Sequence, residues 1–158
     1  MACGRGAGVV IHGVTVQPLT RIKDARGEVM HMLRSDSPLF HAFGEIYFSR
    51  VLPGVIKAWK RHGRITQHLA VPVGSVRFGL YDDRAESPSS GTVQVLEVGE
   101  GAYELVRIPP GIWYGFQGLG RDPSLVANCT DLPYDPVEVE RCDPNDPRMP
   151  AVWFPPRP

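Results

Sequence analysis

Residues 53–71 read PGVIKAWKRHGRITQHLAV. In this stretch an apolar, strand-like run carries Lys57, Trp59 and Lys60, meets a basic turn at residues 61–64, and continues into a second strand that carries His68. Cations, imidazoles and an indole gathered between two strands are typical of a pocket that binds an anion. The alternative is a basic hairpin exposed to water, since most charged clusters are solvated.

A second stretch favours the pocket. Residues 108–116 read IPPGIWYGF and place Trp113 and Tyr114 on a further strand, after a Pro-Pro-Gly turn. We expect the pocket to lie between the hairpin of residues 57–68 and this strand. Trp59 or Trp113 would then stack on a base or a sugar, because an indole flanked by cations is a better ligand platform than a core filler.

The distribution of prolines and glycines along the chain predicts an all-β fold. Its 16 prolines and 17 glycines divide it into short pieces, and almost none of these keeps a helical apolar period for three turns. About ten short strands in this length are typical of a sandwich, a jelly roll or a barrel. The predicted strands span residues 9–16, 28–33, 43–51, 55–59, 66–73, 75–81, 92–98, 103–108, 112–116 and 124–129.

The remaining segments are expected to form loops around a single domain that spans residues 1–158. Residues 82–91 are rich in Ser, Asp and Pro, and residues 131–150 hold acids and prolines that allow one short helix at most. From about residue 144 we expect an arm that docks on the domain. Exposed side chains of Trp153 and Phe154 would otherwise form an adhesive patch.

The charge balance argues against nucleic acid and membrane as partners. Lysine plus arginine equals aspartate plus glutamate, 17 each, so no overall field attracts a polyanion or an anionic membrane. No apolar run approaches the roughly 18 residues that span a bilayer, and residues 1–8 lack the apolar core of a signal peptide. The cysteines Cys3, Cys129 and Cys142 are odd in number and lack a C-x-x-C spacing. The sequence therefore predicts a cytoplasmic protein without a disulfide framework or zinc knuckle.

Four motifs follow one another in a recognisable order. They read DARGE at residues 24–28, GVIKAWK at 54–60, GSVRFGLYDDR at 74–84 and IPPGIWYGF at 108–116. In sequence and spacing they resemble the dTDP-4-dehydrorhamnose 3,5-epimerase family, from about Val14 to Trp153. The resemblance implies a cupin-type jelly roll, a homodimer in which strands are exchanged or shared, and a nucleotide-sugar pocket in the barrel. It implies no metal and no cofactor.

The resemblance also assigns residues to the chemistry. Lys60 stands where the family has its general-base histidine, and Asp146 matches the aspartate that partners this base. His68 replaces the lysine that stabilises the enolate, Asn128 the tyrosine that acts as acid on the opposite face, and Tyr114 a pocket histidine. Because an amide cannot act as an acid, we expect impaired proton delivery from that face, with exchange at one carbon or retention of configuration.

The base has two candidates. Enolisation needs a base with a pKa near neutrality, and a donor or cation at the carbonyl oxygen where negative charge develops. Lys60 meets the first need only if burial and neighbouring cations lower its pKa by about 2 to 3. His62 titrates near neutrality without such a change. His68 or Lys57 would stabilise the enolate, and Tyr114 would return a proton or hold the sugar.

The other candidates bind the substrate. The resemblance implies that Arg26 contacts a phosphate, although its Asp-x-Arg-Gly context equally describes a capped turn. Lys57 takes the place of a family arginine at the pyrophosphate and keeps the charge without the bidentate fork. Glu45 would repel a phosphate and is expected to meet a sugar hydroxyl or a base. We expect no metal, because Tyr114 stands where a metal-binding cupin has its last histidine.

Two hypotheses from different classes follow. The first is a nucleotide-sugar epimerase or ketoisomerase that enolises a nucleoside-diphosphate 4-keto-6-deoxyhexose, in deoxysugar, polysaccharide or natural-product biosynthesis. The second is a non-catalytic nucleotide-sugar-binding cupin that has kept the pocket and lost the epimerase base. The substitution at Lys60 fits both.

Overall fold

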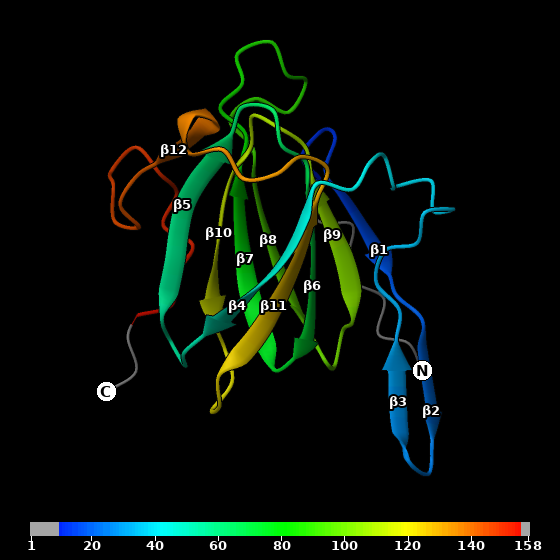
Figure 1. The fold of residues 1–158 in the computed structure, drawn as a ribbon. Helices are drawn as coiled ribbons and strands as arrows, with labels where there is room; N and C mark the ends of the chain where they lie inside the picture. The colour runs from blue at the N-terminus through cyan, green and yellow to red at the C-terminus, as the bar shows by residue number, and fades with distance from the viewer. Residues whose placement is uncertain (1–9, 156–158) are drawn as a thin grey trace.

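The structure is a computed structural model that describes residues 10–155. Two five-stranded antiparallel sheets face each other, with the strand orders β1-β9-β6-β11-β4 and β12-β5-β10-β7-β8, and β2 and β3 form a separate hairpin (Figure 1). The elements are β1 (Thr15–Pro18), β2 (Arg21–Asp24), β3 (Gly27–Met30), β4 (Glu45–Val51), β5 (Ile56–His62), β6 (Gln67–Val73), β7 (Ser75–Tyr81), β8 (Val93–Gly99), β9 (Glu104–Ile108), β10 (Trp113–Gly118), β11 (Ser124–Thr130), the 3₁₀-helix η1 (Pro136–Glu138) and β12 (Val139–Arg141). The predicted all-β jelly-roll fold is confirmed.

Alternating apolar side chains build the core between the sheets. Val76, Phe78 and Leu80 on β7 are all fully buried, as their spacing predicts. Phe78 packs edge-on against Phe116 of β10, with ring centroids 5.6 Å apart, and Leu69 of β6 belongs to the same cluster from the facing sheet. Each such side chain stabilises the fold by about 1.5–3 kcal/mol. Apolar packing therefore holds the two walls of the barrel at a fixed separation.

The sequence predicts neither β2 nor β12. β2 reads Arg-Ile-Lys-Asp and is mostly exposed, so it lacks the buried apolar face by which a strand is recognised. β12 has three residues and is fixed by its pairing with β5, where Arg141 lies opposite Lys60. Both strands depend on their partners rather than on their own pattern. The second pairing matters for the site, because it brings an arginine to the edge of β5.

The prediction of a strand over residues 9–16 is wrong for most of its length. Within the described residues the strand begins at Thr15. Ile11 and Val14 are buried, but they flank a turn in which the Val14 N–H donates to the Ile11 carbonyl at 3.0 Å, and Gly13 has a φ of 89°. A left-handed glycine favours a turn over a strand. Val9 lies outside the described residues.

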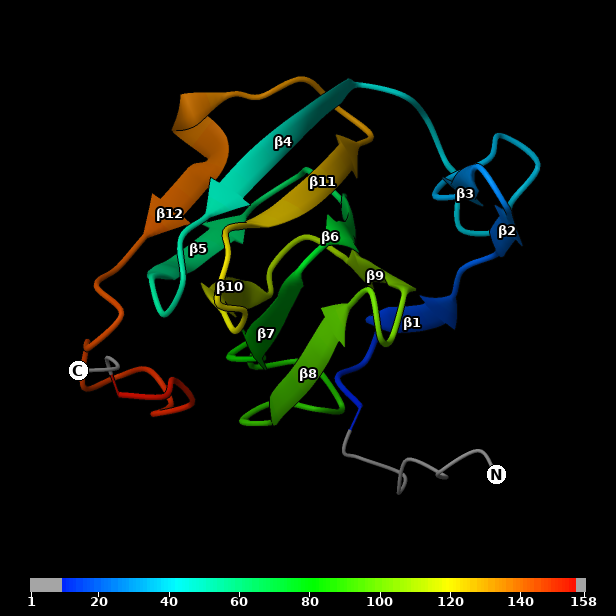
Figure 2. The ribbon, with the colours of Figure 1, turned by 90° about the horizontal axis from the view of Figure 1, so that it is seen from below.

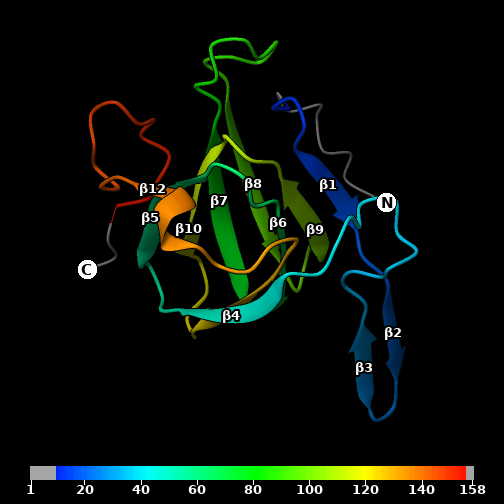
Figure 3. The same cartoon turned by 45° about the horizontal axis from the view of Figure 1, so that its top comes forward.

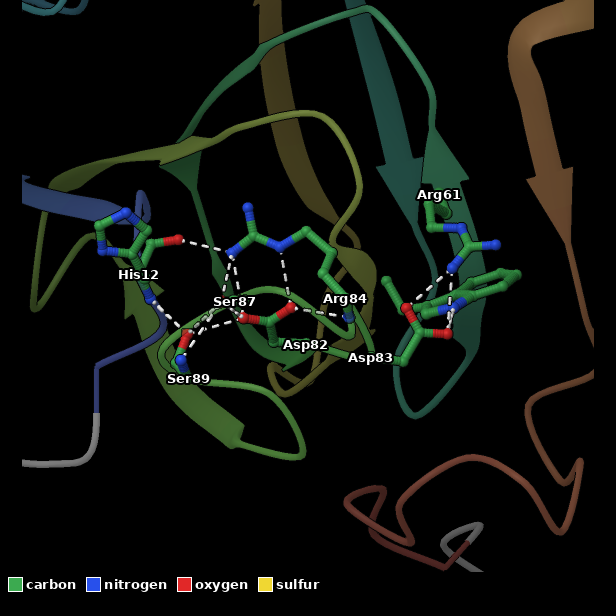
Figure 4. Close-up of polar contacts among 8 residues, drawn as sticks. His12, Arg61, Asp82, Asp83, Arg84, Ser87 and Ser89 are labelled. Atoms are coloured by element: carbon green, nitrogen blue, oxygen red, sulfur yellow. Dashed lines mark hydrogen bonds and ion pairs between the residues drawn. The ribbon is translucent and has the colours of Figure 1, made fainter.

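A polar network pins the loop after β7. The Asp82 carboxylate is fully buried and accepts hydrogen bonds from Arg84, Ser87 and Ser89, while Arg84 also donates to the carbonyl of His12 (Figure 4). Burial opposes ionisation of Asp82, but these hydrogen bonds outweigh it and hold the pKa of this carboxyl well below its usual range. The network thus ties the loop to the turn before β1.

The segment that ends the described chain packs on the second sheet, on the face away from the core. The ring of Trp153 lies 5.0 Å from that of Trp59, measured between centroids. Gln117 exchanges two hydrogen bonds with the backbone of Phe154, at 2.9 and 3.0 Å. A Cβ on Gly79 would come within 2.7 Å of Val152, so only glycine allows this close approach.

The β2–β3 hairpin projects away from the barrel (Figures 1 and 3). Its apolar residues Ile22 and Val29 are 55% and 59% exposed. At its tip Arg26 is 90% exposed and pairs with Asp24 at 2.6 Å. An isolated two-stranded hairpin is marginally stable in water, so these apolar side chains are available for a contact outside the barrel.

Candidate active site

β4 of the first sheet approaches β5 and β12 of the second at one end of the barrel (Figure 2). A cavity is lined by residues of these strands and of the segment after β11. Its volume is about 260 Å³. β4 supplies one wall, β5 the opposite wall, and β12 and the segment after β11 contribute to the rim. The lining residues are Glu45, Tyr47, Lys60, His62, Tyr134 and Arg141.

Strand alternation points these side chains inward. On β4, Glu45 and Tyr47 are half-buried, whereas Ile46 between them is exposed. On β5, Lys60 and His62 both line the cavity. Residues two apart on a strand share a face, so each of these pairs is confined to one wall. Three of the candidates named from the sequence, Glu45, Lys60 and His62, therefore meet in one place.

His62 forms a buried pair with Glu138 of η1. The Nδ1 atom lies 2.5 Å from Oε1 of Glu138, and the two side chains are 6% and 5% exposed. Burial raises the pKa of Glu138, but hydrogen bonds from the Arg64 and Ile65 N–H groups and from His62 outweigh it and keep the pKa below its usual value. Glu138 is thus ionised and accepts, so Nδ1 carries the proton and the lone pair resides on Nε2.

The Nε2 atom of His62 is buried and has no hydrogen-bond partner among residues 10–155. Burial lowers the pKa of this imidazole, and the hydrogen bond with Glu138 offsets the effect only in part, so the pKa lies below its usual value. The ring is therefore neutral at pH 7. It has a free lone pair, oriented by a carboxylate, and belongs to a residue that lines the cavity.

Lys60 is a perturbed cation beside this imidazole. Burial, with contributions from the charges of Arg141 and Lys57, lowers the pKa of Lys60 to about 8. Its Nζ atom lies 5.1 Å from the centroid of the Tyr114 ring and 5.9 Å from that of Phe116. Because the pKa stays above 7, the ammonium form predominates at neutral pH. Lys60 thus supplies a positive charge that is poorly solvated.

Tyr47 faces His62 from the opposite wall. Its hydroxyl oxygen accepts a hydrogen bond of 2.8 Å from Nδ2 of Asn128 on β11. Burial raises the pKa of Tyr47, and the hydrogen bond from Asn128 opposes this only partly. The phenol is consequently protonated at neutral pH. Asn128, assigned from the sequence to a substrate-binding role, contacts this phenol directly.

Tyr114 lies behind the cavity wall. Its ring stacks on His62, with centroids 6.1 Å apart and an interplanar angle of 25°. Burial raises the pKa of this phenol well above 10, and its hydroxyl meets no hydrogen-bond partner in the described part of the chain. Tyr114 therefore braces the imidazole from its own sheet, β10 being the neighbour of β5.

A second cavity of about 370 Å³ adjoins the first and shares Lys60 and Arg141 with it. Lys57, Trp59 and Cys142 also line it. Neither Lys57 nor Arg141 forms an ion pair with any residue between 10 and 155. Two unpaired cations and Lys60 around adjoining cavities make this region suited to an anion.

The two tryptophans occupy different places from those expected. Trp59 lines the second cavity, but its ring packs against Trp153 on the outer face of the sheet. Trp113 lines neither cavity: its Nε1 donates to Asp83 at 2.9 Å, and the guanidinium of Arg61 lies 4.6 Å from its ring centroid. The structure thus places the indoles on the outside of the barrel wall.

Three further candidates lie away from the cavity. His68 is fully buried, and its ring nitrogens lie 3.0 Å and 2.9 Å from the carbonyl oxygens of Cys129 and Leu39. Asp146 accepts hydrogen bonds from Arg148, whose side chain lowers the pKa of this carboxyl to about 2. The carboxylate that contacts a base candidate is therefore Glu138, and Arg26 lies at the tip of the projecting hairpin.

Tyr47, Glu138 and Arg141 are functional candidates that sequence reasoning misses. The alternation of β4 carries a signal for Tyr47, because it shares a face with Glu45 two residues earlier. Glu138 and Arg141 follow a Pro-rich loop and carry no comparable signal. Their positions depend on a 3₁₀ turn and on a three-residue strand that form only against β5.

The described residues hold no helix long and apolar enough to cross a membrane. Nor do three or more His, Cys, Asp or Glu side chains gather in a possible metal site within that part of the chain. The two cysteines that the structure describes, Cys129 and Cys142, are free thiols.

The jelly-roll cavity thus combines an oriented imidazole with a poorly solvated ammonium, two groups suited to acid–base chemistry. No protein-family model matches the chain. The probable low-salt glycan biosynthesis epimerase Agl13 of Haloferax volcanii is 38% identical over 143 residues, which are 89% of this chain and 88% of that protein. The chain belongs to the dTDP-4-dehydrorhamnose 3,5-epimerase-like family of carbohydrate epimerases.

Solved structures agree with this placement. A dTDP sugar isomerase from Desulfovibrio desulfuricans G20 is 49% identical, with a TM-score of 0.88 over 90% of this chain and 92% of that one. A dTDP-4-dehydrorhamnose 3,5-epimerase from Bacillus anthracis shares the fold at 17% identity, with a TM-score of 0.80 over 89% of this chain and 85% of that one. The family suggested by the four sequence motifs is confirmed.

Proposed function

We propose that the protein enolises a nucleoside-diphosphate 4-keto-6-deoxyhexose and so acts as an epimerase or ketoisomerase. The observation that carries this proposal is the buried pair of His62 and Glu138, which leaves a lone pair on Nε2 of a residue that lines the cavity. dTDP is the nucleotide we favour, since the dTDP sugar isomerase is 49% identical to this chain. The pathway we favour is glycan or other deoxysugar biosynthesis, as the name of the Haloferax relative describes for that protein.

The proton moves from carbon to nitrogen in the first step. His62 Nε2 takes the proton α to the ketone, the C–H electron pair forms the carbon–carbon double bond of an enolate, and the carbonyl oxygen gains negative charge. Lys60 stabilises that charge, because an ammonium in a poorly solvated site interacts strongly with an oxyanion. Lys60 is thus the electrophile in this proposal and His62 the base.

The diphosphate is assigned to the second cavity. Lys57 and Arg141 supply charge without acidic partners in residues 10–155, and Arg141 can present a bidentate fork to a phosphate. Lys60 and Arg141 line both cavities, so a sugar in the first would place its diphosphate in the second. Glu45 lies at the sugar end, where a carboxylate accepts hydroxyl hydrogen bonds and does not repel a phosphate.

The non-catalytic alternative is less well supported. It requires that the base was lost when lysine came to occupy position 60. His62 instead lies on the same strand face, with a carboxylate partner in place. A binding protein has no need for a buried carboxylate that fixes the tautomer of a pocket histidine.

We also propose a cytoplasmic homodimer. Free thiols at Cys129 and Cys142 fit a reducing compartment. The hairpin exposes Ile22, and the edge strand β4 exposes Phe48, which is 61% accessible. A second copy that covers both would remove an exposed edge and two apolar surfaces. Sedimentation at micromolar concentration should report a dimer that Ile22→Asp weakens; a wild-type monomer contradicts the proposal.

Deuterium exchange tests the reaction without knowledge of the product. The protein is incubated in heavy water with a panel of nucleotide-linked 4-ketosugars, and incorporation at the carbons next to the ketone is read by NMR. We expect exchange with at least one dTDP-4-ketosugar, and its loss in His62→Ala with nucleotide affinity within a few-fold of wild type. Wild-type protein that binds dTDP but exchanges no substrate would leave the binding cupin as the better explanation.

A further inference from the structure

We infer that Tyr47, oriented by Asn128, is the acid that protonates the enolate on the face opposite His62. The inference rests on the proposed function and concerns the second half of the reaction. The two residues line one cavity from different sheets, Tyr47 on β4 and His62 on β5. A planar enolate between them would expose one face to each wall.

The hydrogen bonds of Asn128 fix the direction in which Tyr47 can donate. Asn128 is buried, and its Oδ1 accepts from the backbone N–H of His68 at 3.2 Å, which sets the orientation of the amide. Its Nδ2 therefore points to Tyr47 and to Oε1 of Gln67, at 2.8 and 2.5 Å. An amide nitrogen only donates, so the Tyr47 oxygen accepts and its own hydrogen points elsewhere.

The direction left for that hydrogen is the cavity. Tyr47 makes no other side-chain hydrogen bond within residues 10–155, and the neighbouring Tyr114 hydroxyl likewise has no partner there. Burial keeps the phenol protonated at neutral pH. Tyr47 is therefore a protonated acid whose hydroxyl is oriented by Asn128, and the amide nitrogen of Asn128 cannot accept the hydroxyl hydrogen.

Two other phenols fit this role less well. Tyr114 lies on β10, in the same sheet as His62, and lines neither cavity. Tyr134 lines the cavity but is 53% exposed, and in the described chain its backbone N–H bonds Glu45 while its hydroxyl has no fixed partner. Tyr47 alone of these three combines the opposite wall with a fixed hydroxyl.

The step balances without any added reactant. The enolate double bond gives an electron pair to the Tyr47 proton, the O–H bond breaks, and a new C–H bond forms on the face opposite the one deprotonated. The carbonyl re-forms and the configuration inverts. Solvent at the cavity mouth reprotonates the Tyr47 phenolate and removes the proton from His62, so the enzyme returns to its starting state.

Substitution of Tyr47 by phenylalanine separates the two half-reactions. In heavy water with an exchanging dTDP-4-ketosugar, the wild type should give deuterated, inverted product. Tyr47→Phe should still exchange the α proton within about tenfold of wild type, because His62 can return a deuteron to the same face. Its rate of inversion should fall by about 10²-fold or more, the range of a lost general acid. Tyr81→Phe, on β7 and away from both cavities, is the matched control.

Asn128→Asp adds a nearly isosteric test. A carboxylate would accept the Tyr47 hydrogen and turn it away from the cavity, so inversion should fall while exchange continues. Inversion at the wild-type rate in Tyr47→Phe overturns the inference, as does wild-type exchange with retained configuration. Both results leave the proposed enolisation standing. Absence of exchange in the wild type instead overturns the proposed function, and the inference with it.

Discussion

Replacement of Glu138 by glutamine should disable the base without removing it. The backbone N–H groups of Arg64 and Ile65 donate to Oε2 at 2.9 and 3.4 Å, so they would hold the amide oxygen of glutamine at that position. The amide NH₂ then faces Nδ1 of His62, where Oε1 lies in the wild type. His62 must accept at Nδ1 and carry its proton on Nε2. That tautomer has no lone pair to offer the substrate.

The expected loss follows from the role of the base. A positioned general base contributes about 10²- to 10⁴-fold, so the rate of α-proton exchange should fall by that factor, or about 3 to 5 kcal/mol of transition-state stabilisation. The hydrogen bonds to this side chain lose the charge of their acceptor, which should also lower the free energy of unfolding by about 1–3 kcal/mol. Because folding lowers the pKa of Glu138, this stability difference is present at neutral pH and shrinks as the pH falls through that pKa.

The assay is deuterium exchange at matched nucleotide saturation, beside urea unfolding of the same samples. Glu140→Gln is the matched control: this carboxylate lies on β12, its side chain is 62% exposed, and it pairs with Arg61 outside the cavity. It should exchange at the wild-type rate. A Glu138→Gln protein that is folded, binds dTDP and exchanges within about threefold of wild type would refute the assignment of His62 as the oriented base.

Three further outcomes are expected. The exchange rate should rise with pH as His62 loses its proton, and it should fall above about pH 8 as Lys60 loses its own. Lys60→Arg should remove the alkaline fall. A wild-type rate that stays constant up to pH 10 contradicts the role of Lys60 as electrophile. Arg141→Gln should weaken dTDP binding about tenfold at low salt and less at high salt, seen in tryptophan fluorescence because Trp59 lines that cavity. Lys60→Met should raise the free energy of unfolding at pH 7, because burial lowers the pKa of Lys60 from 10.5 to about 8 and the ammonium form therefore opposes folding below about pH 8. Urea denaturation that shows no gain in the free energy of unfolding excludes a desolvated Lys60.

The core of the barrel follows from sequence because it depends on local pattern. Alternation in residues 75–81 predicts a half-buried strand, and its apolar set is the core. The placement of Lys60 and His62 does not follow in this way, because the sequence predicts a strand that ends at residue 59 and a turn at residues 61–64, whereas β5 continues to His62 and carries both side chains to one wall. The alternation of apolar and polar residues is a property of the strand itself, so it can be recognised before the neighbouring strands are known.

The rest of the cavity depends on pairing between distant segments. Glu138 reaches His62 across 76 positions, and Tyr47 meets Asn128 across 81. No local propensity specifies such a contact, since it results from how the sheets close. Asp146 was the natural carboxylate by order of motifs, yet Arg148 two residues later neutralises it in a local turn. At Asp146 the local ion pair with Arg148 therefore decides the contact, and the order of the sequence motifs does not.

Strand geometry also explains how the base of the proposed mechanism can lie at a new position. The resemblance to the family puts the usual histidine at position 60, whereas this chain has Lys60 there and His62 two residues on. A displacement of two residues, unlike one of a single residue, keeps a side chain on the same face of a strand and moves it by about 7 Å. Tyr47 and Glu45 share the facing wall with the same spacing. Base, electrophile and acid can therefore be redistributed along β4 and β5 while all of them still face one enolate, provided that each displacement is even.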